Sequence, residues 1–231
     1  MRTSFGVGFI FSLVAVASLA TSSSGDKVKF DLYYESMCGD CEAYMVSAVN
    51  MAFGHGLLEI ADFDIHPFGN ASEKQVDGKW EFTCQHGPDE CAGNMFEACL
   101  IHVVQDFKTF WPIIMCLEET GNPVKYASSC AKSLPFDFTE VYKCYNSDLA
   151  IELEHGYALE TEALNPPHTS VPWVTINGVH TDSIQYQAEN DLIKLICDSY
   201  TGTKVLDACS HYHLREEQTQ TGKCYRDWTF Q

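Results

Sequence analysis

Basic residues are scarce in this chain. Lys and Arg together number 14, against 32 Asp and Glu, which gives a formal net charge of -18. Nucleic-acid binding depends on neutralising phosphates with Lys and Arg, and anionic membrane surfaces attract basic rather than acidic segments. The composition therefore disfavours nucleic acid and acidic membranes as partners. The nine histidines make the charge less negative on acidification.

Long apolar segments are also lacking. One apolar run, residues 9–20, follows the basic Arg2 and precedes small residues. It is too short to span a bilayer, so a cleaved signal peptide over about residues 1–24 is favoured over a membrane anchor. We therefore expect entry to the secretory pathway and no stable membrane insertion. Asn70 heads the one N-x-S/T sequon and is a predicted glycosylation site.

The sequence has no internal repeat and no low-complexity linker, but cysteine is abundant, with 11 residues. In a secretory compartment such a number predicts a disulfide framework. Cys38 and Cys41 form the one CxxC pair, which leaves nine other cysteines, an odd number. At most four disulfides can form among these nine. Cys116 and Cys130 flank a Gly-Asn-Pro turn and are the predicted local bridge.

The order of predicted elements indicates an α/β fold. A strand, the CxxC, a helix, a second strand, a helical block, a β-hairpin and a final helix follow one another. The first helix of this block is predicted from about Asn94 to residue 118, with a kink at Pro112. The predicted hairpin has an Asn-Gly turn. The strands are expected at 28–35 and 60–67, a short extended piece at 79–82, helices at 41–53, 94–118, 137–145 and 147–163, the hairpin at 172–181, and the last helix at 187–199.

A strand–CxxC–helix start and a late strand that opens with proline match the thioredoxin fold. We expect a disulfide-stapled, thioredoxin-like domain over residues 25–206, with a helical insertion at about 84–165 and a cysteine-bearing tail over 207–231. In that fold a cis proline begins the strand opposite the CxxC and leaves the neighbouring backbone free to pair with substrate. Val171 and Pro172 are therefore the predicted substrate-binding residues.

Disulfide exchange needs a thiolate and a second thiol that resolves the mixed disulfide. At a helix start, Cys38 is the predicted exposed nucleophile, because backbone N–H groups and the helix dipole favour its anion. Cys41 lies one turn further on and is the predicted resolving thiol, whereas the carboxylate of Asp40 opposes ionisation of Cys38. A zinc site and a structural disulfide are the alternatives. The first lacks a second close cysteine pair, and the strand–helix context favours redox chemistry over both.

A distinctive string follows at residues 84–99, with the pattern CQHG-x2-EC-x2-N-x4-C. Its fixed residues are Cys84, Gln85, His86, Gly87, Glu90, Cys91, Asn94 and Cys99. This pattern is the signature of the gamma-interferon-inducible lysosomal thiol reductase family. The chain resembles that family over about residues 28–199, including the HPFGNAS run after the second strand and VPWVTING near the end.

The resemblance implies an endosomal, lysosomal or secreted thiol reductase that acts best in acid. Its partners would be disulfide-bonded proteins as substrates and a small thiol as reductant, with no metal and no organic cofactor. A disulfide oxidase or isomerase is the related alternative, because direction depends on potential and supply. A non-catalytic, disulfide-stapled binding protein is the alternative from another class. The Gly39-Asp40 pair differs from the Pro-containing pairs common in the family, so no particular redox potential is carried over.

Within the signature, the three cysteines are expected to staple the loop and the start of the long helix. Asn94 is the predicted N-cap of that helix. His86 is interpreted as a capping or surface residue, in preference to a proton donor near the site or a zinc ligand together with Cys84.

Overall fold

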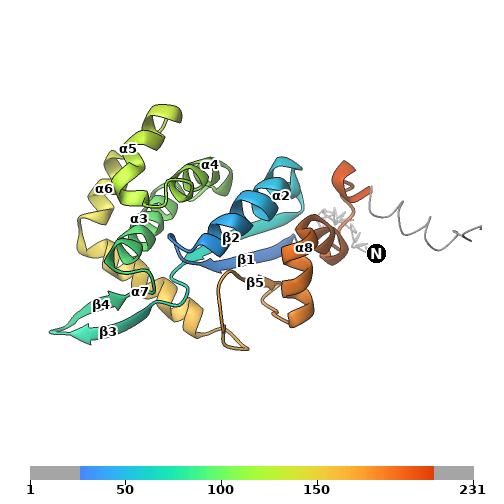
Figure 1. The fold of residues 1–231 in the computed structure, drawn as a ribbon. Coiled ribbons are helices and arrows are strands. Elements are labelled where there is room, and N and C mark those ends of the chain that lie inside the picture. Colours follow the sequence, from blue (N-terminus) through green and yellow to red (C-terminus); the bar gives the residue numbers. More distant parts are fainter. Residues whose placement is uncertain (1–26, 211–231) are drawn as a thin grey trace, which may run out of the picture.

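The computed structural model describes residues 27–210 (Figure 1). The predicted signal peptide and most of the predicted tail lie outside this range. The elements in chain order are β1 (Val28–Tyr34), α1 (Gly39–Tyr44), a π-helical turn (Met45–Val49), α2 (Asn50–Gly54), a 3-10 turn (Leu57–Glu59), β2 (Ala61–Pro67), β3 (Ser72–Val76), β4 (Lys79–Thr83), α3 (Pro88–Val104), α4 (Phe107–Glu118), α5 (Pro123–Ser133), α6 (Thr139–Tyr145), α7 (Asp148–Glu162), β5 (Trp173–Ile176) and α8 (Asp182–Ser199).

A three-stranded sheet in the order β2-β1-β5 forms the centre of the molecule. β1 runs parallel to β2 and antiparallel to β5. The central strand β1 is covered on both faces: Phe30, Leu32 and Tyr34 are fully buried on one face, and Asp31 and Tyr33 are buried on the other. The arrangement β1–α1–β2, followed by an antiparallel β5 and α8, is the thioredoxin-like core that the sequence predicted.

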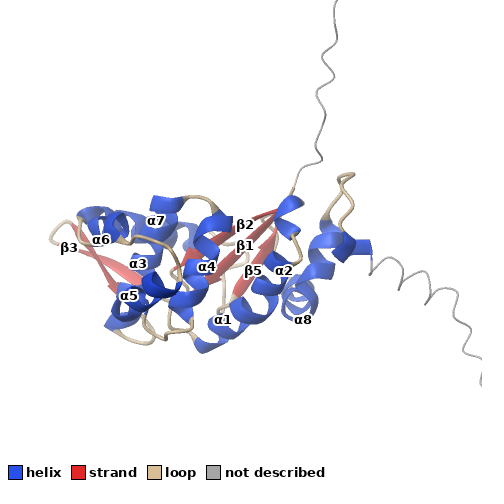
Figure 2. Ribbon diagram, turned by 90° about the horizontal axis from the view of Figure 1, so that it is seen from above, coloured by secondary structure: helices blue, strands red, loops and turns tan. Residues whose placement is uncertain are grey.

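The helices between the two halves of this core form a separate layer at one end of the sheet. Figures 1 and 2 show α3, α5 and α6 gathered at that end and α8 at the other. α3 is the hub of the block, because it packs against α4, α5, α6 and α7 and also reaches β2. The last helix, α8, packs on β5 and on the helical run that follows the CxxC.

Four disulfides staple the described part of the chain. Cys99–Cys144 joins α3 to α6, Cys84–Cys91 closes the loop before α3, and Cys197–Cys209 fastens the segment after α8. The predicted Cys116–Cys130 bridge is present and joins α4 to α5. The ninth cysteine outside the CxxC, Cys224, lies outside the described residues.

The prediction of one long helix over 94–118 is wrong in its start and in the position where the helix is interrupted. The helix begins at Pro88, whose missing N–H costs nothing in the first turn. It ends at Gln105, which has a left-handed φ of 59°, and a second helix then starts at Phe107. Pro112, the expected kink, lies inside α4 without ending it.

The predicted hairpin over 172–181 is reduced to one bridge between Ile176 and Val179. Asn177 and Gly178 do supply the expected turn, with φ values of 52° and 73°. The returning strand fails to extend because the His180 ring stacks on Trp173 and Nδ1 bonds the Val174 carbonyl at 2.8 Å. The chain then enters α8 at Asp182, earlier than the predicted 187.

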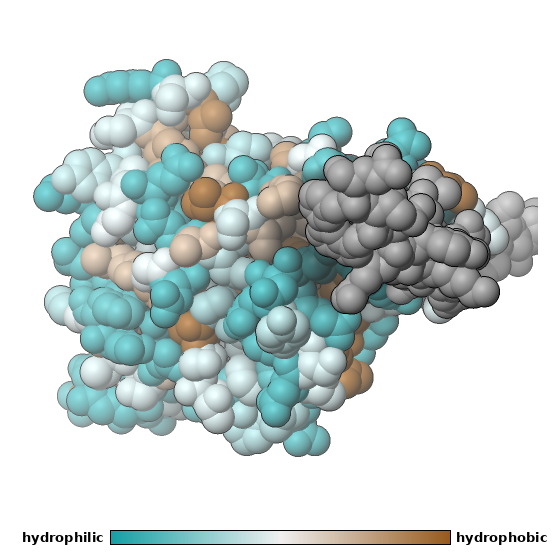
Figure 3. Space-filling view, turned by 45° about the vertical axis from the view of Figure 1, so that its right-hand side comes forward, coloured by the Kyte–Doolittle hydropathy of each residue, from teal (hydrophilic) through white to brown (hydrophobic). Residues whose placement is uncertain are grey.

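Two further elements escaped the sequence analysis. β3 and β4 pair in an antiparallel hairpin around Asp77-Gly78, of which only a short piece was expected. α5 was not expected at all. On the face drawn in Figure 3, apolar residues are scattered among hydrophilic ones. None of the helices over residues 27–210 is long and apolar enough to cross a membrane.

The core contains buried carboxyl groups with no basic partner among the described residues. Glu97 on α3 and Glu118 on α4 lie within hydrogen-bonding reach of each other, and the Tyr34 hydroxyl donates to Glu97 at 2.6 Å. Glu154 on α7 is equally buried and lies beside Asn94. Burial raises the pKa of all three carboxyls, because the charged form loses its hydration.

The free energy of unfolding should therefore fall as pH rises. A carboxyl with a raised native pKa binds more protons in the folded state, so its stabilisation is complete below the unfolded pKa of ~4.3 and is lost as pH rises through the native value. Urea unfolding at about pH 5 and about pH 8 should differ by on the order of 1–3 kcal/mol, with the protein more stable in acid. Glu118→Gln should flatten this dependence, and greater stability at the higher pH would contradict the assignment.

Candidate active site

The CxxC begins a helix. Cys38 is the N-cap of α1, with an extended φ of -83° and ψ of 114°, and its sulfur accepts from the backbone N–H of Cys41 at 3.4 Å. Its own N–H donates to the Glu35 carbonyl at 3.2 Å, which closes the turn between β1 and the helix. The turn therefore presents the Cys38 sulfur to the unpaired N–H groups of the first helical turn.

The two thiols have opposite acidities. The pKa of Cys38 is lowered to about 6, above all by its hydrogen bond with the Cys41 side chain and also by the backbone N–H groups of Cys41 and Asp40. The Asp40 carboxylate opposes this effect, as the sequence predicted. The same bond, together with burial, raises the pKa of Cys41. The pair therefore consists of one readily ionised sulfur and one protonated sulfur that donates to it.

Cys38 is more enclosed than the sequence analysis expected. It is 8 % exposed, and Cys41 is fully buried. The predicted exposed nucleophile is therefore a largely buried thiol that lines a pocket of about 580 Å³. The residues that line that pocket with Cys38 come from four separate segments: Gly39 and Asp40, then Asn70, then Gln85 and His86, then Thr169, Ser170 and Val171.

The Val171–Pro172 bond is cis, as the sequence predicted, and precedes β5. Gln185 on α8 fixes this segment, because its Nε2 donates to the Pro172 carbonyl at 3.0 Å and its Oε1 accepts from Val174 N–H at 3.0 Å. Val171 lines the same pocket as Cys38. The structure thus brings the CxxC and the predicted substrate-binding residues together.

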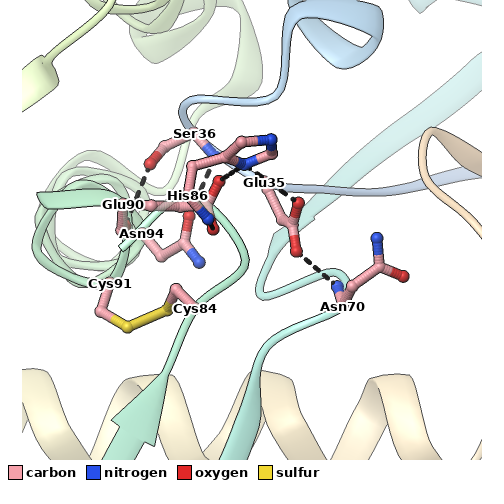
Figure 4. Close-up of a disulfide and its surroundings, with 8 residues drawn as sticks. All are labelled: Glu35, Ser36, Asn70, Cys84, His86, Glu90, Cys91 and Asn94. Carbon is pink, nitrogen blue, oxygen red and sulfur yellow. Dashed lines mark hydrogen bonds and ion pairs between the residues drawn. A yellow bond between two sulfur atoms is a disulfide. The ribbon is translucent and has the colours of Figure 1, made fainter. Parts of the chain in front are cut away.

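Glu35, His86 and Glu90 form a cluster (Figure 4), and His86 of this cluster lines the pocket. Both carboxyls are fully buried, whereas the His86 side chain is 40 % exposed. His86 Nδ1 is hydrogen-bonded to Glu90 and lies 3.8 Å from Glu35. The other Glu35 oxygen accepts from the Asn70 N–H at 2.8 Å.

Charges within this cluster influence one another and Cys38. Burial raises the pKa of Glu35 to about 7, with contributions from Glu90 and from Cys38. The hydrogen bond to Glu90, followed by the nearby Glu35 and Cys38, raises the pKa of His86. In acid the cluster therefore holds a protonated Glu35 and a cationic His86 next to the reactive thiol.

Asn94 does not cap the helix. It lies in the middle of α3, fully buried, and its Oδ1 accepts from the Ser36 N–H at 2.9 Å. The Ser36 hydroxyl donates to the Glu90 carbonyl at 3.2 Å. Gly93 allows this contact, because a Cβ there would lie 2.3 Å from the Ser36 Oγ. The signature asparagine therefore joins α3 to the turn that carries Cys38.

The remaining signature residues divide between the site and the core. Gln85 lines the pocket and accepts from the Asn70 Nδ2 at 2.9 Å. Gly87 has a φ of 95°, which glycine tolerates, and it directly precedes α3. Cys84 and Cys91 close the loop that carries His86, as expected for a staple. Cys99 bonds Cys144 deep in the helical block and takes no part in the pocket.

Sequence reasoning missed Glu35 and Ser36. Neither belongs to the CxxC or to the signature, and their position directly after β1 gave no sign of partners on α3. A glutamate that ends an apolar strand and precedes a CxxC was the one available signal. Its burial depends on Gly69, where a Cβ would approach the Glu35 Cγ to 2.4 Å and φ is 57°.

Known proteins resemble the chain in sequence. The sequence profile described as Gamma interferon inducible lysosomal thiol reductase (GILT) matches residues 29–134. The gamma-interferon-inducible lysosomal thiol reductase of Carassius auratus is 42% identical, covering 77% of this chain and 70% of the relative. The gamma-interferon-responsive lysosomal thiol protein of Arabidopsis thaliana is 38% identical, covering 86% and 82%. The thiol reductase of Mus musculus with the same name as the fish protein is 35% identical, covering 79% and 72%.

Solved structures of bacterial oxidoreductases also resemble the fold. The oxidoreductase NmDsbA1 from N. meningitidis is 14% identical, with a TM-score of 0.45 over 88% of this chain and 91% of that chain.

Titration of Cys38 tests the geometry of the CxxC. The rate of alkylation of the reduced protein should reach half its maximum near pH 6, because the pKa of Cys38 is lowered to about 6. Asp40→Asn should lower this midpoint further, since the Asp40 charge opposes the thiolate. A midpoint at the ~8.5 of a free thiol would show that the helix start does not activate Cys38.

Proposed function

Because this chain belongs to the gamma-interferon-inducible lysosomal thiol reductase family, we propose that it reduces disulfides of protein substrates in an acidic endosomal or lysosomal compartment. The chain is a thiol–disulfide oxidoreductase. The observation that carries the proposal is the pairing of a Cys38 thiol whose pKa is about 6 with a protonated Cys41. The alternative location is outside the cell, where a secreted form of the protein would carry out the same chemistry.

In the proposed mechanism Cys38 attacks a substrate disulfide and forms a mixed disulfide. Cys41 then attacks the Cys38 sulfur, releases the reduced substrate and leaves a Cys38–Cys41 disulfide. A small thiol reduces that disulfide and completes the cycle. Val171 lines the pocket with Cys38, which supports a substrate backbone at this segment, next to the sulfur that attacks.

The low pKa of Cys38 supports activity in acid. One pH unit below a pKa of about 6, roughly a tenth of the Cys38 thiols are still ionised. An unperturbed thiol, with a pKa of ~8.5, is almost entirely protonated there. The lysosome as the compartment is inferred from the names of the relatives.

The two cysteines should be unequal in a trapping experiment. Cys38→Ser should abolish turnover of insulin at acid pH, because the other free cysteine among the described residues, Cys41, is fully buried and its pKa is raised. Cys41→Ser should accumulate covalent adducts with substrate, because no thiol then resolves the mixed disulfide. Non-reducing gels followed by reduction measure both outcomes.

Both variants should be made in a protein that also carries Cys224→Ser. Cys224 is the ninth cysteine outside the CxxC, and an unpaired thiol there would form or resolve adducts of its own. Adducts with Cys38→Ser and none with Cys41→Ser would reverse the roles. Wild-type activity in both variants would leave the CxxC without a catalytic role.

We also propose a glycan on Asn70. The residue is exposed, and its Nδ2 lies on the rim of the pocket, bonded to Gln85. Expression in a eukaryotic secretory host should yield a protein that loses mass on treatment with an N-glycosidase. Ser72→Ala removes the sequon without altering Asn70 and should give the smaller mass from the start. An unchanged mass after treatment of the wild type would contradict the proposal.

A further inference from the structure

His86 is held as a cation at the edge of the Cys38 pocket. Glu90 accepts from His86 twice, from its backbone N–H at 3.0 Å and from its ring at Nδ1. The second carboxyl, Glu35, is 3.8 Å from the same ring nitrogen. The charged or titratable groups around His86 are thus Glu90 of α3, Glu35 of the turn after β1, and Cys38 at the start of α1.

This ring has one fixed nitrogen and one free nitrogen. With Nδ1 bonded to Glu90, Nε2 points away from both carboxyls (Figure 4). The side chain is 40 % exposed and lines the same pocket as Cys38, Asp40 and Val171. A disulfide that reaches the Cys38 sulfur therefore enters a pocket that the exposed His86 side chain also lines.

The loop that carries His86 is built to keep the ring in place. Cys84–Cys91 closes it on one side, and Gly87 turns the chain directly into α3. Glu90, which orients the ring, is itself anchored through its carbonyl to the Ser36 hydroxyl. The ring orientation is thus tied to the turn that positions Cys38.

The same three side chains offer one ligand atom each within 4.8 Å, a spacing that a metal ion would also accept. His86 Nδ1, however, already makes a direct hydrogen bond to the Glu90 carboxyl. Glu90 uses its other oxygen on the His86 backbone. An imidazolium pairs with the Glu90 carboxylate without moving either group, so the proton is the better cation for this cluster.

We propose that His86 is a catalytic acid that protonates the sulfur leaving the substrate. This inference rests on the proposed role of Cys38 as nucleophile. In the first step the Cys38 thiolate forms a new S–S bond with one substrate sulfur while the substrate S–S bond breaks. The other substrate sulfur departs with the electron pair and takes the proton from His86 Nε2. The products are the mixed disulfide, a free substrate thiol and a neutral His86, which is reprotonated from water.

The proposal explains why a signature histidine lies beside a thiol of lowered pKa. An alkyl thiolate is a poor leaving group in exchange, because its conjugate acid has a high pKa. In acid a nearby imidazolium neutralises it as it forms. Glu90 is a positioning residue in this account, since it accepts from Nδ1, raises the pKa of His86 and leaves Nε2 on the side away from the carboxyls (Figure 4).

The test compares two substrates in single-turnover reduction by the full protein. His86→Gln should slow reaction with an alkyl disulfide, such as a cystine-containing peptide, by about 10²-fold, within the range of general acid catalysis. It should leave reaction with an aromatic disulfide nearly unchanged, because an acidic aromatic thiol leaves without a proton. The wild-type rate on the peptide should also fall as pH rises through the pKa of His86, and this falling limb should vanish in the variant.

His155→Gln is the matched control. His155 also bonds a glutamate through Nδ1, to Glu73 at 2.8 Å, but it stacks on Trp80 away from the pocket. This variant should keep both rates and the falling limb. Equal slowing of both substrates by His86→Gln would indicate a purely structural role and overturn the proposal, as would no slowing of either. Loss of wild-type activity in a chelator would instead place a metal in the cluster and overturn it.

The reaction of the aromatic disulfide keeps the two proposals apart. If Cys38 is not the nucleophile, Cys38→Ser retains activity on both substrates. If only the role of His86 is wrong, Cys38→Ser is inactive on both, and His86→Gln fails to discriminate between them.

Discussion

The geometry of the site depends on the contact between α3 and the turn at Glu35–Ser36, which we call the joint. The Ser36 N–H is bonded by Asn94, its hydroxyl by the Glu90 carbonyl, and Gly93 leaves the space for both. These are buried polar groups, and losing one partner leaves the other unsatisfied at about 1–3 kcal/mol. The joint links the thioredoxin-like core, which carries Cys38, to the helical block, which carries His86 and Glu90. Neither half alone has a complete pocket.

Acid acts on the core and on the site in the same direction. Raised pKa values at Glu35, Glu97 and Glu118 mean that each carboxyl is neutral in acid and is forced toward a costly buried charge as pH rises. Each of these groups also interacts directly or through a neighbour with Cys38. Their protonation therefore removes negative charge from the surroundings of the thiolate. At a higher pH these carboxyls ionise, which lowers the stability of the fold and raises the pKa of Cys38.

The sequence predicted those parts of the molecule that depend on neighbours in the chain. The strand before the CxxC, the acidity of Cys38 against Asp40 and the Cys116–Cys130 bridge across a short turn are local features. The β3–β4 hairpin was only half expected although Asp77-Gly78 is a turn signal, because β3 is mostly exposed and carries no apolar alternation, whereas Trp80 and Phe82 alternate in β4.

Features that depend on distant contacts were missed or misread. The helix boundary at Gln105 depends on a left-handed residue that no propensity favours. Asn94 is a good N-cap type, yet its side chain is used by Ser36, which lies 58 positions earlier in the chain. Cys38 was expected to be exposed because helix starts usually are. The loops at Asn70, Gln85 and Thr169 enclose it, and they meet only in the folded structure.

Two disulfides of the helical insertion have different effects: one mainly stabilises the fold, and the other mainly fixes the position of the loop that carries His86. Cross-links that close longer loops remove more entropy from the unfolded chain, so Cys99–Cys144, with a separation of 45 residues, contributes more to global stability than Cys84–Cys91, with a separation of 7. The short bridge lies instead on either side of His86 and the first turn of α3. Its main effect is to limit where the His86 ring and the Glu90 carboxyl can go. The helical insertion thus places His86, with its Nδ1 bonded to Glu90, at the pocket that the helix start of the CxxC lines.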